Sequence, residues 1–178
     1  YPSLKYPKDR DTLWDGLLDG LLSIVSTDDA TTSLEVKLSG KTIEDAVGGH
    51  NGLETRLPIL FSEGVMKRHM SLQQFANAAA TNPARILGMY PQKGIIAPGS
   101  DADIVIIDPT VRKRLRKEDL HDGSDYTIWE GWDIQGYPII TMLRGKVIVE
   151  HDHFLGLPED GRFVHRKIQA EVLSSPIC

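Results

Sequence analysis

One stretch near the start of the chain restricts the fold more than any other, because a helical repeat runs directly into a short apolar segment. Apolar residues recur at a helical period from Asp9 to Leu22, with aspartates on the opposite face. Residues 23–26 (Ser-Ile-Val-Ser) follow at once and have the short, partly β-branched character of a buried parallel strand. A helix followed closely by such a strand is typical of α/β folds, in which functional residues gather at the carboxyl ends of strands. The sequence therefore predicts an α/β protein.

Further helices and one long loop are predicted in the first half of the chain. A helical pattern runs from Glu54 to Arg68, where Pro58 is acceptable in the first turn. Another begins at Ser71 with a capping box and should end near Ala80, because the proline at position 83 disfavours continuation. Residues 30–52 form a long loop between the strand predicted at 23–26 and the helix predicted from Glu54, and loops of this length are usually functional.

The pattern changes to β-strands after Lys93. A strand is predicted over residues 102–108 and should be stopped by Pro109. Residues 139–149 predict two strands across a tight turn at Arg144-Gly145. We therefore predict two units, residues 1–92 and residues 93–178.

The overall composition narrows the class of protein. The chain is 40% hydrophobic and 25% charged, as is ordinary for a globular protein, and its net charge of -5 gives no sign of a nucleic acid partner. No apolar run reaches the roughly 18 residues that cross a membrane. The single cysteine, Cys178, favours a reducing compartment such as the cytoplasm. The chain begins at Tyr1 with no initiator methionine or charged leader, which favours missing upstream residues.

Asp28 is the best single candidate for chemistry. It follows the predicted strand at residues 23–26, where a carboxylate can bind a metal ion or move a proton. The alternative is that Thr27 or Asp28 only caps the following turn. The local sequence leaves both interpretations open.

Four other patterns favour structural roles. His151-Asp152-His153 resembles a metal-binding pair, but its place at a hairpin tip without further ligands favours a solvated turn. The basic run Arg112–Lys117 favours a charged sheet edge over a phosphate or nucleic acid contact. The aromatic residues between 126 and 137 indicate core packing or an interface. His50 lies in a glycine-rich loop with no partner in view.

Several motifs together resemble one family. They are Ser-Thr-Asp at 26–28, Gly-Leu-Glu-Thr-Arg-Leu-Pro at 52–58, Leu-Phe-Ser-Glu-Gly-Val at 60–65, and the stretches 81–91, 93–105, 124–127 and 136–145. These resemble the closing segment of the dihydropyrimidinases and D-hydantoinases of the amidohydrolase superfamily. The Asn-Pro-Ala and Gly-Ser-Asp-Ala-Asp pieces are widespread among amidohydrolases, whereas Glu-Thr-Arg and Phe-Ser-Glu-Gly narrow the likeness to this branch.

The resemblance implies the carboxyl-terminal part of a (β/α)8 barrel in residues 1–92 and strands of a side β-sandwich in residues 93–178. It also implies two zinc ions, bridged by a carboxylated lysine, that activate hydroxide for attack on a cyclic amide. Asp28 matches the aspartate that binds a metal and moves a proton to the leaving nitrogen. The other ligands are expected upstream of Tyr1, so these 178 residues alone are expected to be inactive. A homo-oligomer, tetrameric or dimeric, is also implied.

The resemblance further implies which residues hold the substrate. Tyr1 and Gly48 match positions where the family's main chain binds the ring, although the family commonly has serine and asparagine there. Asp29 also departs from the family, since many members have histidine after the aspartate. Hydantoins, dihydropyrimidines and other cyclic ureides all remain possible substrates. An allantoinase, or an inactive relative that serves as an oligomeric interaction module, are the alternatives.

Overall fold

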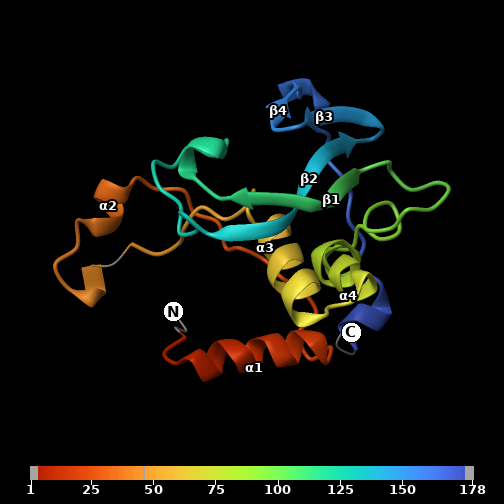
Figure 1. Ribbon diagram of the computed structural model, residues 1–178. Coiled ribbons are helices and arrows are strands. Elements are labelled where there is room, and N and C mark those ends of the chain that lie inside the picture. Colours follow the sequence, from red (N-terminus) through yellow and green to blue (C-terminus); the bar gives the residue numbers. More distant parts are fainter. Residues whose placement is uncertain (1–3, 46, 175–178) are drawn as a thin grey trace.

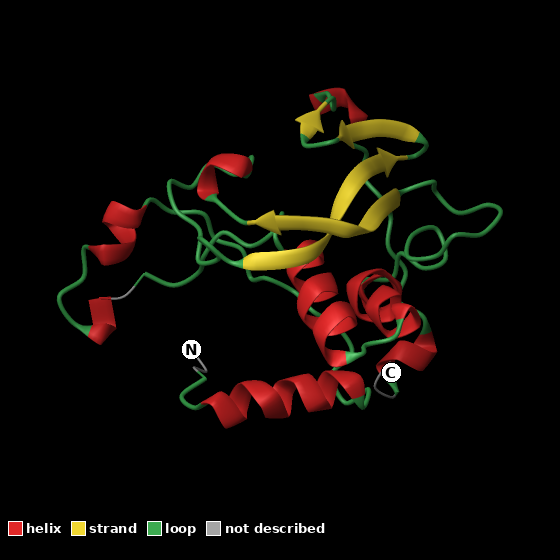
Figure 2. Ribbon diagram, in the orientation of Figure 1, coloured by secondary structure: helices red, strands yellow, loops and turns green. Residues whose placement is uncertain are grey.

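The computed structural model describes residues 4–45 and 47–174, and it arranges them as helices followed by an antiparallel sheet (Figure 1). In chain order the elements are α1 (Pro7–Leu18), α2 (Leu34–Leu38), η1 (Ile43–Asp45), α3 (Arg56–Leu60), η2 (Phe61–Met66), α4 (Leu72–Ala76), η3 (Asn77–Thr81), α5 (Asn82–Ile86), β1 (Ile104–Arg114), η4 (Lys117–Asp119), β2 (Asp133–Leu143), β3 (Lys146–Glu150), β4 (His153–Phe154), η5 (Pro158–Asp160) and η6 (Ala170–Leu173). The strands are hydrogen-bonded in the order β1-β2-β3-β4, and each pair is antiparallel. Figure 2 shows α3 and α4 beneath the sheet and α1 beneath these helices. The α/β class is confirmed, and the division near residue 92 stays a prediction.

Helix α1 begins and ends earlier than the apolar pattern predicted. Pro7 suits the first helical turn, and the Asp9 carboxylate accepts two backbone N–H groups just before the helix at 2.9 and 3.0 Å. The helix ends at Leu18 because Gly20 adopts a left-handed conformation (φ 78°), which commonly terminates helices. The predicted end at Leu22 is therefore wrong, because the prediction did not take Gly20 into account.

The segment that follows α1 is extended but is not a strand, so the strand predicted at residues 23–26 is wrong. Its one backbone hydrogen bond within the described residues joins the Val25 N–H to the Ala78 carbonyl at 3.2 Å. A strand is defined by ladder partners, and the neighbouring chain here is a helix.

The predicted helix from Glu54 is confirmed in position, although it combines α and π turns. It begins at Arg56, so Pro58 lies in the first turn as predicted. The π turn η2 continues the same helix to Met66.

The helix that begins after Ser71 is confirmed at its start and wrong at its end. The Gln74 N–H donates to Ser71 Oγ at 3.1 Å, and the Ser71 N–H donates to Gln74 Oε1 at 2.8 Å, which completes the capping box. The chain stays helical beyond Ala80, to Ile86. The π turn η3 precedes Pro83, which then lies in the first turn of α5, where a missing N–H is tolerated.

The sheet confirms the predicted hairpin and extends the predicted first strand. Arg144 and Gly145 both have positive φ (48° and 82°), which suits a two-residue turn between antiparallel strands. β1 passes Pro109 and continues to Arg114, so the predicted stop is wrong. The register shifts between Asp108 and Arg112, and such an irregularity accommodates a proline within a strand.

Two apolar clusters hold the helices and the sheet together. One is built on Leu60, Met70 and Ala79, and the other on Leu115, Ile134 and Tyr137. Ile59 of α3 packs against the second cluster, so the two halves of the chain share this contact. Gly136 is required at the junction, because a Cβ there would lie 2.3 Å from the Phe61 ring.

The structure also tests two interpretations from the sequence, those of the His151-Asp152-His153 turn and of the aromatic stretch between residues 126 and 137. His151 and Asp152 form the exposed β3–β4 turn with positive φ (45° and 64°), which confirms the solvated turn. Trp129 packs against the second cluster, whereas Trp132 is 43% exposed, so packing describes only part of the aromatic stretch. Within the described residues, no helix has the length and apolar character needed to span a membrane.

Candidate functional site

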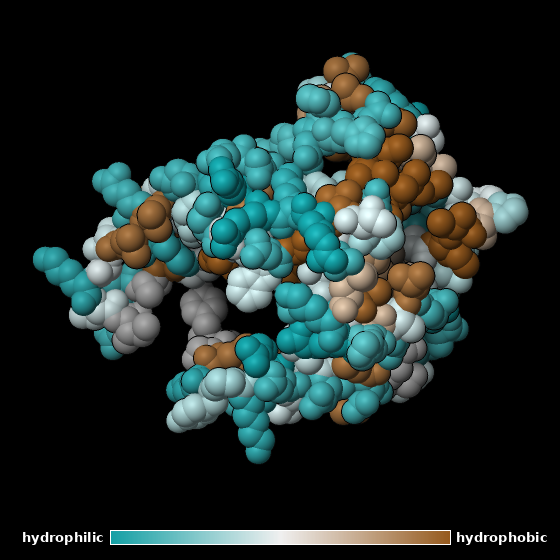
Figure 3. Space-filling view, in the orientation of Figure 1, coloured by the Kyte–Doolittle hydropathy of each residue, from teal (hydrophilic) through white to brown (hydrophobic). Residues whose placement is uncertain are grey.

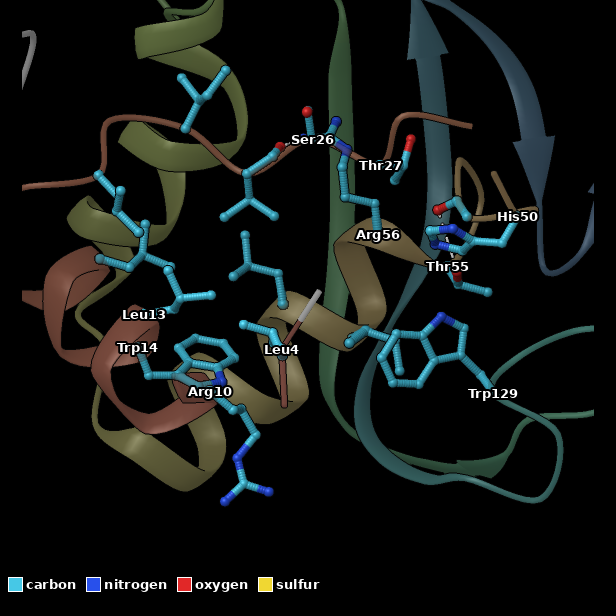
Figure 4. A pocket seen from close by; sticks show the side chains of 17 residues that line it. Leu4, Arg10, Leu13, Trp14, Ser26, Thr27, His50, Thr55, Arg56 and Trp129 are labelled. Atoms are coloured by element: carbon cyan, nitrogen blue, oxygen red, sulfur yellow. Dashed lines mark hydrogen bonds between the residues drawn. The ribbon is translucent and has the colours of Figure 1, made fainter. Parts of the chain in front are cut away.

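An apolar hollow lies between α1, the extended segment and α3 (Figure 4). It has a volume of about 520 Å³. Its lining includes Trp14 of α1, Thr27 of the extended segment, Arg56 of α3 and Trp129 of the loop before β2. His50 closes the end nearest Thr27. The hollow therefore brings the end of the extended segment next to the glycine-rich loop.

Asp28 lies directly after the part of the extended segment that lines this hollow. Ser26 and Thr27 belong to the lining, and Asp28 is exposed just beyond them. Its backbone is left-handed (φ 49°), a conformation that costs most L-residues free energy, although aspartate tolerates it better than most. A strained backbone at a polar residue is a pattern that clusters at functional sites. The catalytic and metal-binding role of Asp28 stays a prediction.

Asp29, and not Thr27 or Asp28, is the capping residue here, and it caps the turn before α3. Asp29 Oδ2 accepts the N–H groups of Gly52 and Leu53 at 2.6 and 2.9 Å, and these bonds lower the pKa of Asp29. The Ala30 N–H donates to the His50 carbonyl at 3.1 Å, so the two loops are tied at a second point. Asp29 therefore carries the capping task, and the Asp28 carboxylate makes no hydrogen bond within residues 4–45 and 47–174.

Arg56 fastens the extended segment from the other side. Its guanidinium donates to the Val25 and Ala79 carbonyls, each at 3.2 Å, and burial lowers the pKa of Arg56. One carbonyl belongs to the extended segment and the other to η3, so the guanidinium joins these two parts of the chain. Arg56 thereby sets the position of the residues that lead to Asp28.

The predicted substrate-holding positions are only partly described. Tyr1 lies outside the described residues. Gly48 is half-buried in the same loop as His50 and Gly52, which line the hollow, but is not itself part of the lining. The Lys37 ammonium donates to the carbonyls on either side of Gly48, at Val47 (2.6 Å) and at Gly49, and so fixes this loop.

The described residues do not suffice for a metal centre. Zinc sites take three or four ligands, and within residues 4–45 and 47–174 no three side chains of the His, Cys, Asp or Glu type come together. Asp28 offers carboxylate oxygens of the right chemistry, but it is a single donor. No chemical step through a metal follows from these residues.

Sequence patterns missed two parts of this arrangement. The roles of Asp29 and Arg56 depend on contacts with residues 23 and 31 positions away, which no local pattern encodes. Arg56 did fall within the Glu-Thr-Arg motif. The sequence predicts no functional partner for His50, yet the structure places it in the lining of the hollow, beside Thr27.

Known proteins match both the sequence and the fold. The Amidohydrolase family model matches residues 2–148. The chain is 40% identical over 168 residues to the D-phenylhydantoinase of Escherichia coli O1:K1 / APEC, covering 93% of this chain and 36% of that protein. The dihydropyrimidinase structure from Brevibacillus agri NCHU1002 has a TM-score of 0.90 and 38% identity, covering 95% of this chain and 37% of that one. The L-hydantoinase (dihydropyrimidinase) structure from Arthrobacter aurescens has a TM-score of 0.85 and 33% identity, covering 93% and 37%.

The α/β fold and these likenesses place the chain in the structural class of the proteins it matches. The chain belongs to the amidohydrolase family. The likeness to dihydropyrimidinases and D-hydantoinases is confirmed, and the chain spans 36% of the length of the D-phenylhydantoinase relative.

Proposed function

We propose that this chain is the carboxyl-terminal part of a metal-dependent hydrolase that opens cyclic amides such as hydantoins or dihydropyrimidines. The observation that carries the proposal is the 40% identity with a D-phenylhydantoinase along 93% of the chain. A D-hydantoinase structure matches the chain at 38% identity and an L-hydantoinase structure at 33%. Sequence identity therefore does not indicate which enantiomer the proposed substrate would have.

We propose that residues 1–92 close a (β/α)8 barrel and that residues 93–178 add strands to a side β-sandwich. Two features support this arrangement. The extended segment with Val25 forms no strand ladder within the described residues and borders an apolar hollow, so it leaves room for the neighbouring strands that a barrel would supply. The sheet also exposes apolar side chains that a second sheet could cover, seen as brown atoms around β2 and β3 in Figure 3.

In the proposed reaction, a water-derived oxygen bonds to the amide carbon as the C–N bond breaks, and Asp28 takes a proton from that water and gives it to the departing nitrogen, which stays attached to the opened product. An amide nitrogen is a poor leaving group until it is protonated, and a positioned carboxyl group can supply that proton. The division of labour between Asp28 and Asp29 supports this role, because the cap occupies only the Asp29 carboxylate. In the whole protein, Asp28 would also give one ligand to zinc, and the remaining ligands would come from other segments.

The main chain at Tyr1 and Gly48 is proposed to hold the ring of the substrate. Gly49 supports a fixed loop here, because its positive φ (78°) and its approach to Ala30 leave no room for a Cβ, which would lie 2.4 Å from the Ala30 Cβ. We also propose a homo-oligomer in the cytoplasm; the single cysteine at the last position supports the reducing compartment.

The test is a hydrolysis assay on the full-length protein that contains these residues. Hydantoin, dihydrouracil and allantoin serve as substrates, each with and without a metal chelator. Asp28→Asn should lower kcat by about 100-fold or more, the usual range for loss of an acid–base group. The matched control is Asp15→Asn, since Asp15 is an exposed carboxylate on α1.

Each outcome assigns or removes a part of the proposal. Hydrolysis of hydantoin or dihydrouracil that stops on chelation supports it, and activity on allantoin alone replaces it with an allantoinase. Absence of activity on all three substrates leaves an interaction module, for which sedimentation equilibrium measures the oligomer. Full activity of Asp28→Asn would remove the role of Asp28.

A further inference from the structure

A second cavity, apart from the candidate site, has four cationic residues among the eight that line it. It lies between the end of η2 and the adjoining ends of β1 and β2, and its volume is about 520 Å³. Lys67, Arg112, Lys113 and Arg114 line it, with Asp133 as the only carboxylate among the lining residues. The whole chain carries a net charge of -5, so this concentration of positive charge is local and does not reflect the composition.

The strand register places two of these arginines together. Arg112 pairs with Gln135 and Arg114 pairs with Asp133 across β1 and β2, so both arginines project from one face of the sheet. Residues two apart on a strand are separated by about 7 Å. Lys113 also belongs to the lining, but its side chain projects from the opposite face, where its ammonium pairs with Asp152 at 3.0 Å and lies 4.4 Å from the Tyr137 ring centre, so its charge does not add to that of the two arginines.

The cations differ in how far their charge is already neutralised. Lys67 is paired with Glu63 at 2.5 Å. Arg114 meets Asp133 only at 3.5 Å, and both side chains are largely exposed, so that pair is weak. Arg112 makes no ion pair or side-chain hydrogen bond within the part of the chain that the structure describes. The guanidinium of Arg112, with part of that of Arg114, is therefore available to a ligand.

The shape of the guanidinium group identifies the chemistry of that ligand. Its planar fork of N–H donors matches two oxygens of a phosphate or carboxylate group, and its charge persists at every physiological pH. Two arginines whose Cα atoms are about 7 Å apart on one strand face carry side chains long and flexible enough to approach a single tetrahedral anion from two sides.

We propose that Arg112 and Arg114 bind a phosphate group in this cavity, as free phosphate or as the phosphate of a small ester. The proposal does not depend on the hydrolase activity, because none of these residues belongs to the candidate site. Asp133 competes with the ligand for Arg114 and limits the affinity.

The test is calorimetric titration of the chain with inorganic phosphate and with glycerol phosphate at constant ionic strength. We expect saturable binding with a Kd on the order of 1 mM. Arg112→Gln and Arg114→Gln should each weaken it by about tenfold, as the loss of a bidentate charged contact implies. Asp133→Asn should strengthen it severalfold, because it frees Arg114. Circular dichroism confirms that each variant is folded.

Arg116→Gln is the matched control. Arg116 has the same charge and is also exposed, yet it lies outside the cavity and pairs with Glu118 at 3.1 Å. Its replacement should change the Kd less than twofold. Tighter binding of glycerol phosphate than of inorganic phosphate supports an ester ligand, and equal affinity supports the free ion.

Three results overturn the proposal. One is the absence of saturable binding for either ligand. Another is equal weakening by Arg116→Gln, which would indicate a diffuse positive surface. The third is much tighter and steeply salt-dependent binding of an oligonucleotide, which would indicate an extended nucleic acid surface instead.

Discussion

Asp28 and Asp29 are adjacent carboxylates with separate tasks. Asp29 accepts two backbone N–H groups of the neighbouring loop, and these bonds hold its pKa below the usual range. Asp28 keeps an exposed carboxylate on a left-handed backbone. Within residues 4–45 and 47–174 no hydrogen bond of the Asp28 side chain offsets the cost of this backbone conformation, so the fold alone gives no reason for an aspartate at this position.

This argument predicts the stability of two variants that both lack the Asp28 carboxylate. Glycine adopts a left-handed backbone without strain, whereas alanine does not. Asp28→Gly should therefore be more stable than Asp28→Ala by about 1 kcal/mol, although both should lose activity in the full-length protein. Urea unfolding at pH 7 measures the difference. Equal stability of the two variants would contradict the left-handed conformation at this position.

At the scale of elements, the accuracy of sequence prediction depended on how local each signal was. The capping box at Ser71 and the turn at Arg144 were predicted correctly, because the residues that form them are close in sequence. The strand around Val25 and the stop at Pro109 were wrong, because a ladder partner and a register shift belong to distant chain segments. The contact of Asp29 with Gly52 in the candidate site was not predicted for the same reason, because the two residues are distant in sequence.

Elements far apart in the sequence also meet at His121. Its Nδ1 lies 2.9 Å from Glu54 Oε1 before α3, and its Nε2 lies 3.0 Å from the Asp152 carbonyl in the β3–β4 turn. Both ring nitrogens face acceptors, and only the protonated ring can donate to both. The hydrogen bond with Glu54 raises the pKa of His121. Lys113 neutralises the Asp152 carboxylate at 3.0 Å and stays charged in the same pH range.

The raised pKa predicts how stability depends on pH. Because the folded state holds the proton more tightly, the His121 contact stabilises fully below the unfolded pKa of about 6.5 and is lost as pH rises through the higher folded pKa. His121→Gln should therefore be less stable than the parent by up to about 1 kcal/mol at pH 5.5, with the difference shrinking above pH 6.5. Urea unfolding across this range measures it, with His153→Gln, at an exposed position of β4, as the control. A difference that stays constant with pH would contradict the protonated bridge.

At the scale of the whole molecule, the chain matches its relatives along most of its own length but spans 36% of the D-phenylhydantoinase. Its fold is that of the matched structures, with a TM-score of 0.90 to the dihydropyrimidinase. Within residues 4–45 and 47–174 no three side chains of the His, Cys, Asp or Glu type come together, so the proposed metal ligand Asp28 needs partners from other segments. The proposed activity therefore belongs to an assembly of segments and not to this one alone.

Zinc titration tests this whole-molecule argument directly. One carboxylate cannot replace the three or four ligands of a zinc site, so the 178 residues alone should bind no zinc with a submicromolar Kd. The full-length protein should bind two ions per subunit, and Asp28→Asn should weaken at least one of them. His151→Gln should leave both unchanged, because His151 lies in the exposed β3–β4 turn and not beside Asp28. Tight binding of two zinc ions by the 178 residues alone would show that the ligands lie within this chain, and the proposed assembly from several segments would then be wrong.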